Sequence, residues 1–170
     1  KYGFGDDAPA DFYTRYIQTF GRVVQPDVMM IDIYPIRSTK KGEAPHSREY
    51  FENLAIVRQV AMKQGVPYWL FIQSYDHDGK IRRPSDSDLR FQLFTPLTLG
   101  FTGIAYFTYD PALGAGLIDG KQNRTPLYYL AARANGEVEN MGQVLRFLDS
   151  TGFAFVLGRH EENGRSVRNS

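Results

Sequence analysis

Tyrosines stand close to an acid or an amide at three places where an apolar segment ends. These places are residues 32–35 (DIYP), 73–76 (QSYD) and 106–110 (YFTYD). A carboxylate can exchange protons, an amide donates and accepts hydrogen bonds at once, and a tyrosine joins a flat apolar ring to a hydroxyl. This set suits a hydroxyl-rich ligand. Asp32 is the catalytic candidate, and the predicted ligand contacts are Tyr34, Gln73, Tyr75, Tyr106 and Tyr109.

Each candidate also has a structural interpretation. Asp32 is the one acid in an apolar run, so it must be hydrogen-bonded, ion-paired or functional. Its structural partner would be Arg82, Arg83 or a backbone turn. Gln73 either contacts ligand hydroxyls or bonds to neighbouring loops, and each tyrosine taken alone can be a core residue.

Other catalytic and cofactor motifs are missing from the sequence. Its glycine-rich segments lack the strand–GxGxxG–helix context, and neither a P-loop nor a GxSxG motif occurs. Cysteine is absent, which excludes disulfides and thiolate metal sites. The histidines lie far apart, and the segment 76–78 (DHD) is expected to be a solvated loop or a rim that touches ligand. We therefore expect no metal and no cofactor.

The positions of apolar residues predict alternating helices and strands. Phe12, Tyr16 and Phe20 recur at helical spacing, and Gly65 follows a second helix as a C-terminal cap. The segment 85–88 (SDSD) has the spacing of a capping box. The predicted helices are 11–24, 48–64, 86–99 and 125–148, and the predicted strands are 27–34, 66–73, 102–108 and 153–157.

This alternation indicates an α/β fold made of parallel (β/α) units, in which function lies at the carboxyl ends of the strands. Two architectures fit: an open doubly wound sheet, or the last strands of a (β/α)8 barrel that run into the start of a β-rich domain. For the barrel, residues 1–150 form its carboxyl-terminal part, and residues 151–170 begin a following β-domain or tail.

The composition of the chain limits the classes of molecule that it is expected to bind. The 170 residues carry a net charge of only +1, which gives no reason to expect a nucleic acid or an anionic membrane surface. No apolar run reaches the length of about 18 residues that a transmembrane helix needs. Aromatic residues make up 14% of the chain, which suits either an aromatic-rich core or a concave site lined by rings.

The order of segments resembles a known family. The segments are PDVMMIDIYPI (26–36), YFENLAIVRQVAMKQGVPYWLFIQSY (50–75), RRPSDSDLRFQLFTPLTLGFTGIAYFTYDP (82–111) and GLIDGKQNRTPLYYLAARANGEVENMGQVLRFL (116–148). Together they resemble the carboxyl-terminal half of bacterial (β/α)8-barrel glycoside hydrolases related to β-galactosidase-like barrels. The resemblance implies that the three strands are the sixth, seventh and eighth of a TIM barrel, followed by a β-sandwich.

The resemblance also implies hydrolysis of an O-glycosidic bond by two carboxylates, one on the fourth strand and one on or near the seventh. The fourth strand would precede Lys1, and the seventh-strand position is Gln73, which cannot act as a nucleophile or base. Three alternatives follow. The second carboxylate is elsewhere, with Asp32 as the candidate; both acids precede this segment; or the protein binds sugar without cleaving it.

We therefore carry three functional hypotheses: a carbohydrate-active hydrolase, a non-catalytic carbohydrate-binding barrel, and an open α/β domain that binds another small molecule. Three or four barrel strands would leave two exposed edges, so we expect this segment to pair with the missing half of its own barrel or with another copy. Secretion or a periplasmic location is implied by the resemblance alone.

Overall fold

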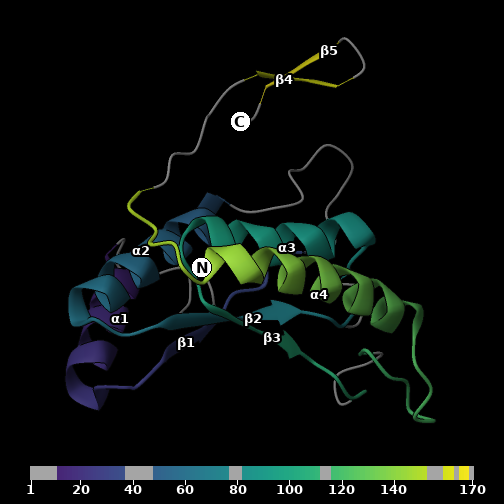
Figure 1. Ribbon diagram of the computed structural model, residues 1–170, viewed down its shortest axis with the longest axis horizontal. Coiled ribbons are helices and arrows are strands. Elements are labelled where there is room, and N and C mark those ends of the chain that lie inside the picture. The colour runs from purple at the N-terminus through teal and green to yellow at the C-terminus, as the bar shows by residue number, and fades with distance from the viewer. Residues whose placement is uncertain are drawn as a thin grey trace.

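The computed structural model describes residues 11–36, 48–76, 82–111 and 116–152, and the backbone of residues 159–162 and 165–168. Four helices and a three-stranded parallel sheet form the main body, as the predicted α/β class requires (Figure 1). None of the helices in the described ranges is long and apolar enough to cross a membrane.

The predicted helices and the first three predicted strands are present, with ends that differ by up to three residues. The strands are shorter than predicted because only residues that pair in the ladder belong to them. The elements are α1 (Phe12–Val24), β1 (Met29–Asp32), α2 (Arg48–Gln64), β2 (Tyr68–Gln73), α3 (Asp86–Thr98), β3 (Gly103–Phe107), α4 (Pro126–Leu145), β4 (Arg159–Glu162) and β5 (Arg165–Arg168). The predicted strand 153–157 lies outside the described residues, and β4 and β5 pair antiparallel.

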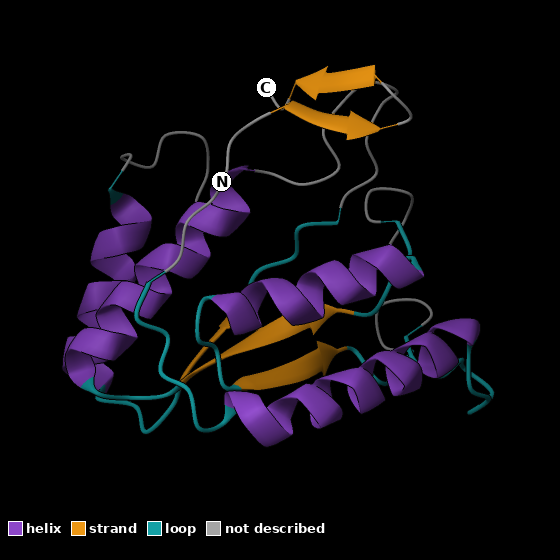
Figure 2. Ribbon diagram, turned by 45° about the horizontal axis from the view of Figure 1, so that its top comes forward, coloured by secondary structure: helices purple, strands orange, loops and turns teal. Residues whose placement is uncertain are grey.

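The sheet has the order β1-β2-β3, so strands that follow one another in the chain are neighbours. Both pairs are parallel: Met29 lies opposite Tyr68, and Trp69 lies opposite Gly103. Figure 2 shows the three arrows running in the same direction. All three strands therefore end at one edge, which brings residue 32 and the segments after residues 73 and 107 together.

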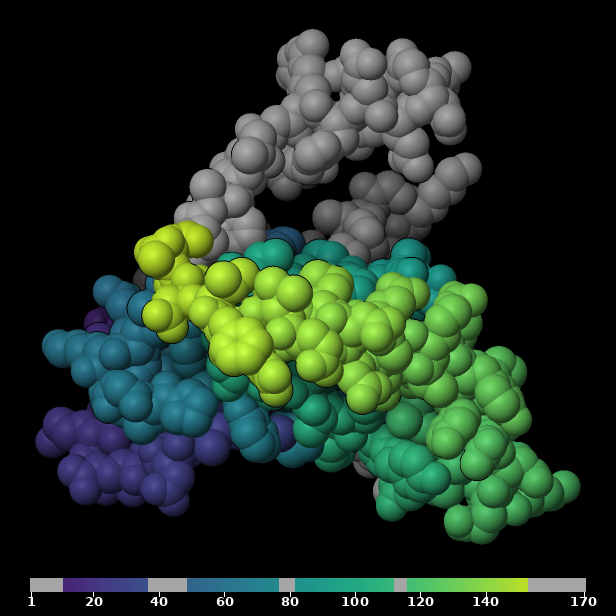
Figure 3. Space-filling view, viewed as in Figure 1, coloured from purple at the N-terminus to yellow at the C-terminus, as the bar shows by residue number. Residues whose placement is uncertain are grey.

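One face of the sheet carries the core. Alternate strand residues such as Met29, Leu70 and Ile72 are fully buried, and Ile104 and Tyr106 pack against the same cluster. Every described helix packs there, and examples are Ile17, Leu54, Leu93 and Ala134 from α1 to α4. Figure 3 shows this helical face, with α4 in yellow-green lying across it.

The opposite face is not covered by any helix in the described ranges. Because side chains alternate along a strand, this face carries Asp32 from β1, Trp69 and Phe71 from β2, and Phe107 from β3. Asp32 is exposed, and Trp69 and Phe107 keep 38% and 36% of their surface exposed. A doubly wound sheet has helices on both faces, so the described part of the chain does not have that architecture.

The start of α3 is fixed by a capping box, as its spacing predicts. Ser85 Oγ accepts a hydrogen bond from the backbone N–H of Asp88, and Asp88 Oδ2 accepts one from the N–H of Ser85 at 2.8 Å. Arg82 adds a two-pronged ion pair to the same carboxylate, with distances of 2.5 and 2.9 Å. Burial alone would raise the pKa of Asp88, but the hydrogen bonds from Arg82 and Ser85 hold it at about 2.

Helices α3 and α4 lie side by side and are joined by ion pairs on their outer surfaces. Arg90 binds both oxygens of Glu137, and Arg133 binds Asp86 at 2.7 Å. These side chains are at least one-third exposed, so each pair contributes little on its own. The buried residues Leu93 of α3 and Ala134 of α4 hold both helices against the core, and the ion pairs join their outer sides.

We expect Asp88→Asn to destabilise the fold by about 1–2 kcal/mol at pH 6, since the pKa of Asp88 lies below its unfolded value of about 4. This contribution is present above pH 4 and disappears as the pH falls from about 4 to about 2. Urea unfolding of both proteins at pH 6, 4 and 3 measures the difference. The exposed control Asp149→Asn should change the free energy of unfolding by less than about 0.5 kcal/mol. A difference between wild type and Asp88→Asn that stays constant with pH would contradict this account.

Candidate functional site

The carboxyl edge of the sheet holds a cluster of three rings. The ring centroids of Tyr34 and Tyr75 are 5.7 Å apart, and each lies 5.8 Å from that of Phe107. Phe71 adds an edge-on contact to Phe107 at 6.3 Å. Tyr75 is buried, whereas Phe107 keeps 36% of its surface exposed. The cluster therefore presents part of an aromatic surface to whatever occupies this edge.

Asp32 lies at the end of β1 on the same side of the sheet as these rings. Burial chiefly, and the Asp32 carboxylate in addition, raise the pKa of both Tyr34 and Tyr75 above the ordinary value. The two hydroxyls therefore remain protonated and can donate hydrogen bonds. One charge and two donors are close enough to influence each other here.

The structural partners predicted for Asp32 bind elsewhere. Arg82 pairs with Asp88, and Arg83 pairs with Asp76 at 3.1 Å. Within the described ranges, the carboxylate of Asp32 has no ion pair and accepts no side-chain hydrogen bond. This arrangement leaves the functional interpretation of Asp32 in place.

Gln73 is fully buried at the end of β2. Its side-chain Nε2 donates to the carbonyl oxygens of Tyr75 and Arg82 at 3.3 and 3.2 Å. Its Oε1 accepts no hydrogen bond from the described residues, although it is buried. The two loop contacts favour the structural interpretation of Gln73, which holds the loops after β2 in place beside the rings.

The side chain of a second glutamine, Gln92, supplies the hydrogen-bond partners that the backbone at the end of β2 lacks. Since β1 ends at Asp32 opposite Phe71, the backbone of Gln73 has no strand partner on that side. Gln92 of α3 replaces the strand: its Oε1 accepts from the N–H of Gln73 at 2.8 Å, and its Nε2 donates to the carbonyl oxygen of Gln73 at 3.2 Å. Gln92 is fully buried, so these bonds form away from water.

The exits of β2 and β3 are also bonded to each other. The N–H of Ser74 donates to the carbonyl oxygen of Phe107 at 2.7 Å, and Ser74 Oγ donates to that of Thr108 at 3.0 Å. Thr108 Oγ1 donates in turn to Asp110 Oδ1 at 2.8 Å. The peptide bond between Phe107 and Thr108 is cis. The three hydrogen bonds of Ser74 and Thr108 hold the backbone that carries the Phe107 ring.

The other two predicted tyrosines lie apart from the ring cluster. Tyr106 belongs to the core face, where its hydroxyl donates to Asn135 of α4 at 2.5 Å. Burial raises the pKa of Tyr106 to about 12, against the opposing effect of the bond with Asn135. Tyr109 is 56% exposed in the loop after β3. The structure thus brings Asp32, Tyr34 and Tyr75 together, places Tyr106 under a helix, and leaves Tyr109 at the rim.

Sequence reasoning missed the contribution of Phe71, Phe107 and Trp69. The signal that identifies them is the alternation of side chains along a strand. Trp69 and Phe71 precede Gln73 by four and two residues and so lie on the same face as Gln73, and Phe107 is opposite Gln73 in the ladder. The indole of Trp69 lies against Gly103, where an added Cβ would come within 2.4 Å of the ring, and its Nε1 donates to Thr102 Oγ1 at 3.2 Å. Gly103 therefore allows the indole to lie against β3.

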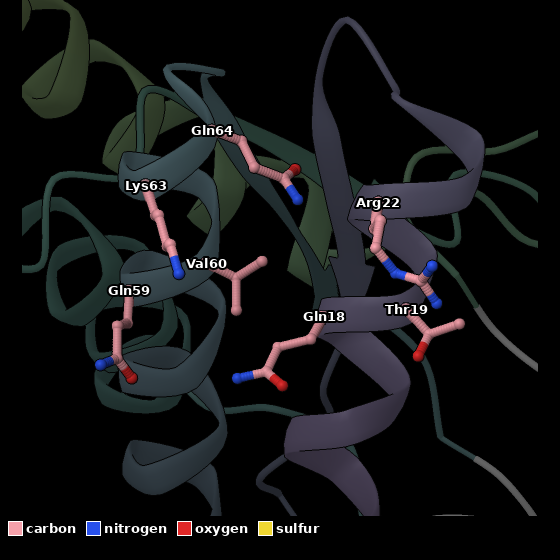
Figure 4. Close-up of a pocket in the computed structure, with 7 residues that line it drawn as sticks. All are labelled: Gln18, Thr19, Arg22, Gln59, Val60, Lys63 and Gln64. Atoms are coloured by element: carbon pink, nitrogen blue, oxygen red, sulfur yellow. The ribbon is translucent and has the colours of Figure 1, made fainter.

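A separate cleft of about 510 Å³ lies between α1 and α2 (Figure 4), lined by Gln18, Thr19, Arg22, Gln59, Val60, Lys63 and Gln64. It adjoins the ends of α1 and α2 that lead into β1 and β2, so it is on the side where the strands begin. Arg22 and Lys63 stand in the last turns of their helices, where a cation interacts favourably with the helix dipole. No aromatic ring lines the cleft, and none of the predicted site residues lies in it, so we place the candidate site at the carboxyl edge.

No group of three or more metal-binding side chains occurs among the described residues. The loop segment 77–81, which contains His77 and Asp78, lies outside them. Asp76 is ion-paired with Arg83 and Asp110 accepts from Thr108, so the described edge offers the carboxylate of Asp32, two phenolic donors and an aromatic surface. This arrangement can bind a ligand that has both hydroxyl groups and an apolar face.

Replacing Gln92 by Leu should lower the free energy of unfolding by about 2 kcal/mol or more, because a buried N–H and a buried C=O of Gln73 lose their partners. Denaturant unfolding measures this loss. The same substitution at the exposed Gln143 of α4 should cost less than about 0.5 kcal/mol. Equal effects at the two positions would show that the bridge to Gln73 is unimportant.

Gly103→Ala should displace the indole of Trp69, since the new methyl group and the ring cannot share the same space. Trp69 is the only tryptophan in the chain, so a red shift of the emission spectrum reports this movement directly. Gly136→Ala in α4 is the matched control, because its Cβ would meet no atom within 4 Å. An unchanged spectrum in Gly103→Ala would contradict the packing described for Trp69.

Comparison of the chain with known protein families, with curated proteins and with solved structures gives no match.

Proposed function

We propose that the carboxyl edge of this sheet is the sugar-binding mouth of a (β/α)8-barrel glycoside hydrolase. The sheet has sequential strand order and packs all its described helices on one face, as an arc of such a barrel does. The face without helices then corresponds to the interior of the barrel. Strands from elsewhere in the protein, or from another copy, would pair with the free edges of β1 and β3.

The single observation that carries the proposal is the grouping of Asp32 with the rings of Tyr34, Tyr75 and Phe107. The C–H face of a sugar stacks on an aromatic ring, and its hydroxyls exchange hydrogen bonds with a carboxylate and with phenols. Because Tyr34 and Tyr75 stay protonated, they serve as donors to ring or hydroxyl oxygens, while Asp32 accepts hydrogen bonds. The three groups thereby orient the sugar along the ring surface.

Hydrolysis of a glycosidic bond ordinarily needs two carboxyl groups, one of which protonates the leaving oxygen. In the proposed mechanism Asp32 is one of the pair, or orients the hydroxyl next to the reacting carbon. The second carboxyl group comes from a part of the protein outside the described edge. Gln73 holds the loops after β2 and takes no part in proton transfer.

A panel of aryl glycosides and polysaccharides, offered to the intact protein, tests this proposal. Hydrolysis is expected, and Asp32→Asn should lower kcat/KM by about 100-fold or more if Asp32 is one of the catalytic pair. Asp27→Asn removes the same charge just before β1 at the opposite end of the sheet and should leave kcat/KM unchanged. Absence of both hydrolysis and binding across the panel would overturn the proposal.

A non-catalytic carbohydrate-binding barrel is the second candidate. The observation in its favour is that Asp32 is the only carboxylate beside the rings in the described part of the chain, while the end of β2 carries the amide of Gln73. This candidate predicts binding without turnover. The same panel separates it from the hydrolase, because sugars would bind and remain intact.

A further inference from the structure

The charge beside the ring cluster is not neutralised by any described residue. In the described parts of the loops after β1 and β2, the cationic side chains are Arg82 and Arg83, and they are held by Asp88 and Asp76. Among the described residues, Asp32 is the charged group that raises the pKa of the hydroxyls of Tyr34 and Tyr75, in addition to their burial. The described site therefore carries one negative charge and no positive charge.

The rings add to the attraction for a cation. The face of an aromatic ring carries partial negative charge and attracts an ammonium group within about 6 Å of its centroid. Phe107 keeps 36% of its surface exposed, and Tyr34, whose ring is tilted by 31° against it, is partly exposed. Asp32 lies opposite Phe71 in the ladder, the ring of Phe71 is 6.3 Å from that of Phe107, and Tyr34 follows Asp32 by two residues, so the acid and the rings share one end of the open face.

We propose that the sugar bound at this edge carries a protonated amine, so that the ligand is an amino sugar. This inference rests on the proposed carbohydrate function. The ammonium group pairs with the Asp32 carboxylate and touches the faces of Tyr34 and Phe107, while the sugar ring uses the remaining aromatic surface. A neutral sugar makes the same stacking contacts but leaves the charge of Asp32 without a partner.

The preference for the amino sugar over the neutral sugar should depend on protonation of the ligand's amine. It should not depend on ionisation of Tyr34 or Tyr75. Burial, together with Asp32, keeps the pKa of Tyr34 and Tyr75 above the ordinary tyrosine value, so neither hydroxyl changes its charge near neutral pH. Raising the pH until the amine is neutral removes the ammonium and leaves the rings and Asp32 as they are. The amino sugar should then bind no better than the neutral one.

Calorimetric titration of the intact protein with pairs of oligosaccharides tests the inference. Each pair has the same length and linkage and differs only in an amine or a hydroxyl at C2, in the gluco and the galacto series. The expected result is about tenfold tighter binding of the amino member when it is protonated, from the ion pair and the ring contact together. The preference should vanish at high pH.

Three variants locate the effect. Asp32→Asn should abolish the preference while binding of the neutral sugar persists, and Asp32→Glu should retain part of it. Asp27→Asn, which removes an exposed carboxyl group at the opposite end of the sheet, should retain all of it. If Asp32→Asn fails to fold, the dependence of wild-type binding on amine and pH decides alone.

The outcomes separate the two proposals. Equal or tighter binding of the neutral sugars would overturn the amino-sugar inference and leave the carbohydrate function standing. A preference that survives Asp32→Asn would overturn the role of Asp32 as the partner of the amine. If no sugar in either series binds or is hydrolysed, both this inference and the proposed function are wrong.

Discussion

The structure depends on one reciprocal pair of hydrogen bonds between two buried glutamines. Where a strand extends beyond the end of its neighbour, its buried N–H and C=O groups need other hydrogen-bond partners, because leaving them without a partner destabilises the fold. Gln92 meets this requirement for β2 and fixes α3 over the end of the strand. The side chain of Gln73 can then hold the following loop, and the loop positions Tyr75 against Tyr34 and Phe107. The geometry of the site thus follows from the hydrogen bonds that Gln73, at the end of β2, makes with Gln92 and with the following loop.

One-sided packing decides where chemistry can occur. The helices bury Leu70, Ile72 and Tyr106, so the residues beside them in the chain must point to the opposite face. That face combines Trp69, Phe71 and Phe107 with Asp32, a composition that would be unfavourable if it simply faced water. A ligand, the remainder of a barrel, or both would reduce the exposed apolar surface. The same alternation that builds the core therefore also supplies the aromatic surface of the site.

Local sequence signals predicted the four helices and the three parallel strands, but not the strands β4 and β5 or the face on which each strand residue lies. Helical spacing, the cap at Gly65 and the SDSD capping box predicted α2 within its observed bounds and the start of α3. Tyr106 shows the limit. A shift of one residue in a strand turns a side chain to the other face, and the sequence 103–107 is apolar or aromatic at nearly every position. The bridge from Gln92 was beyond prediction for a related reason: a glutamine within a helix resembles a solvated one until tertiary packing buries it.

Gln73 shows how position and role can be separated. It occupies the end of a central strand, where a barrel enzyme can place a catalytic carboxylate, yet its amide is buried and bonded to two loop carbonyls. A carboxylate has no N–H to donate, so a Glu in its place would face these carbonyl oxygens without a hydrogen bond and would be driven away or protonated. The loop contacts therefore require an amide. Because this requirement removes the acid from β2, the charge that any ligand meets at the described edge is concentrated on Asp32 of the neighbouring strand.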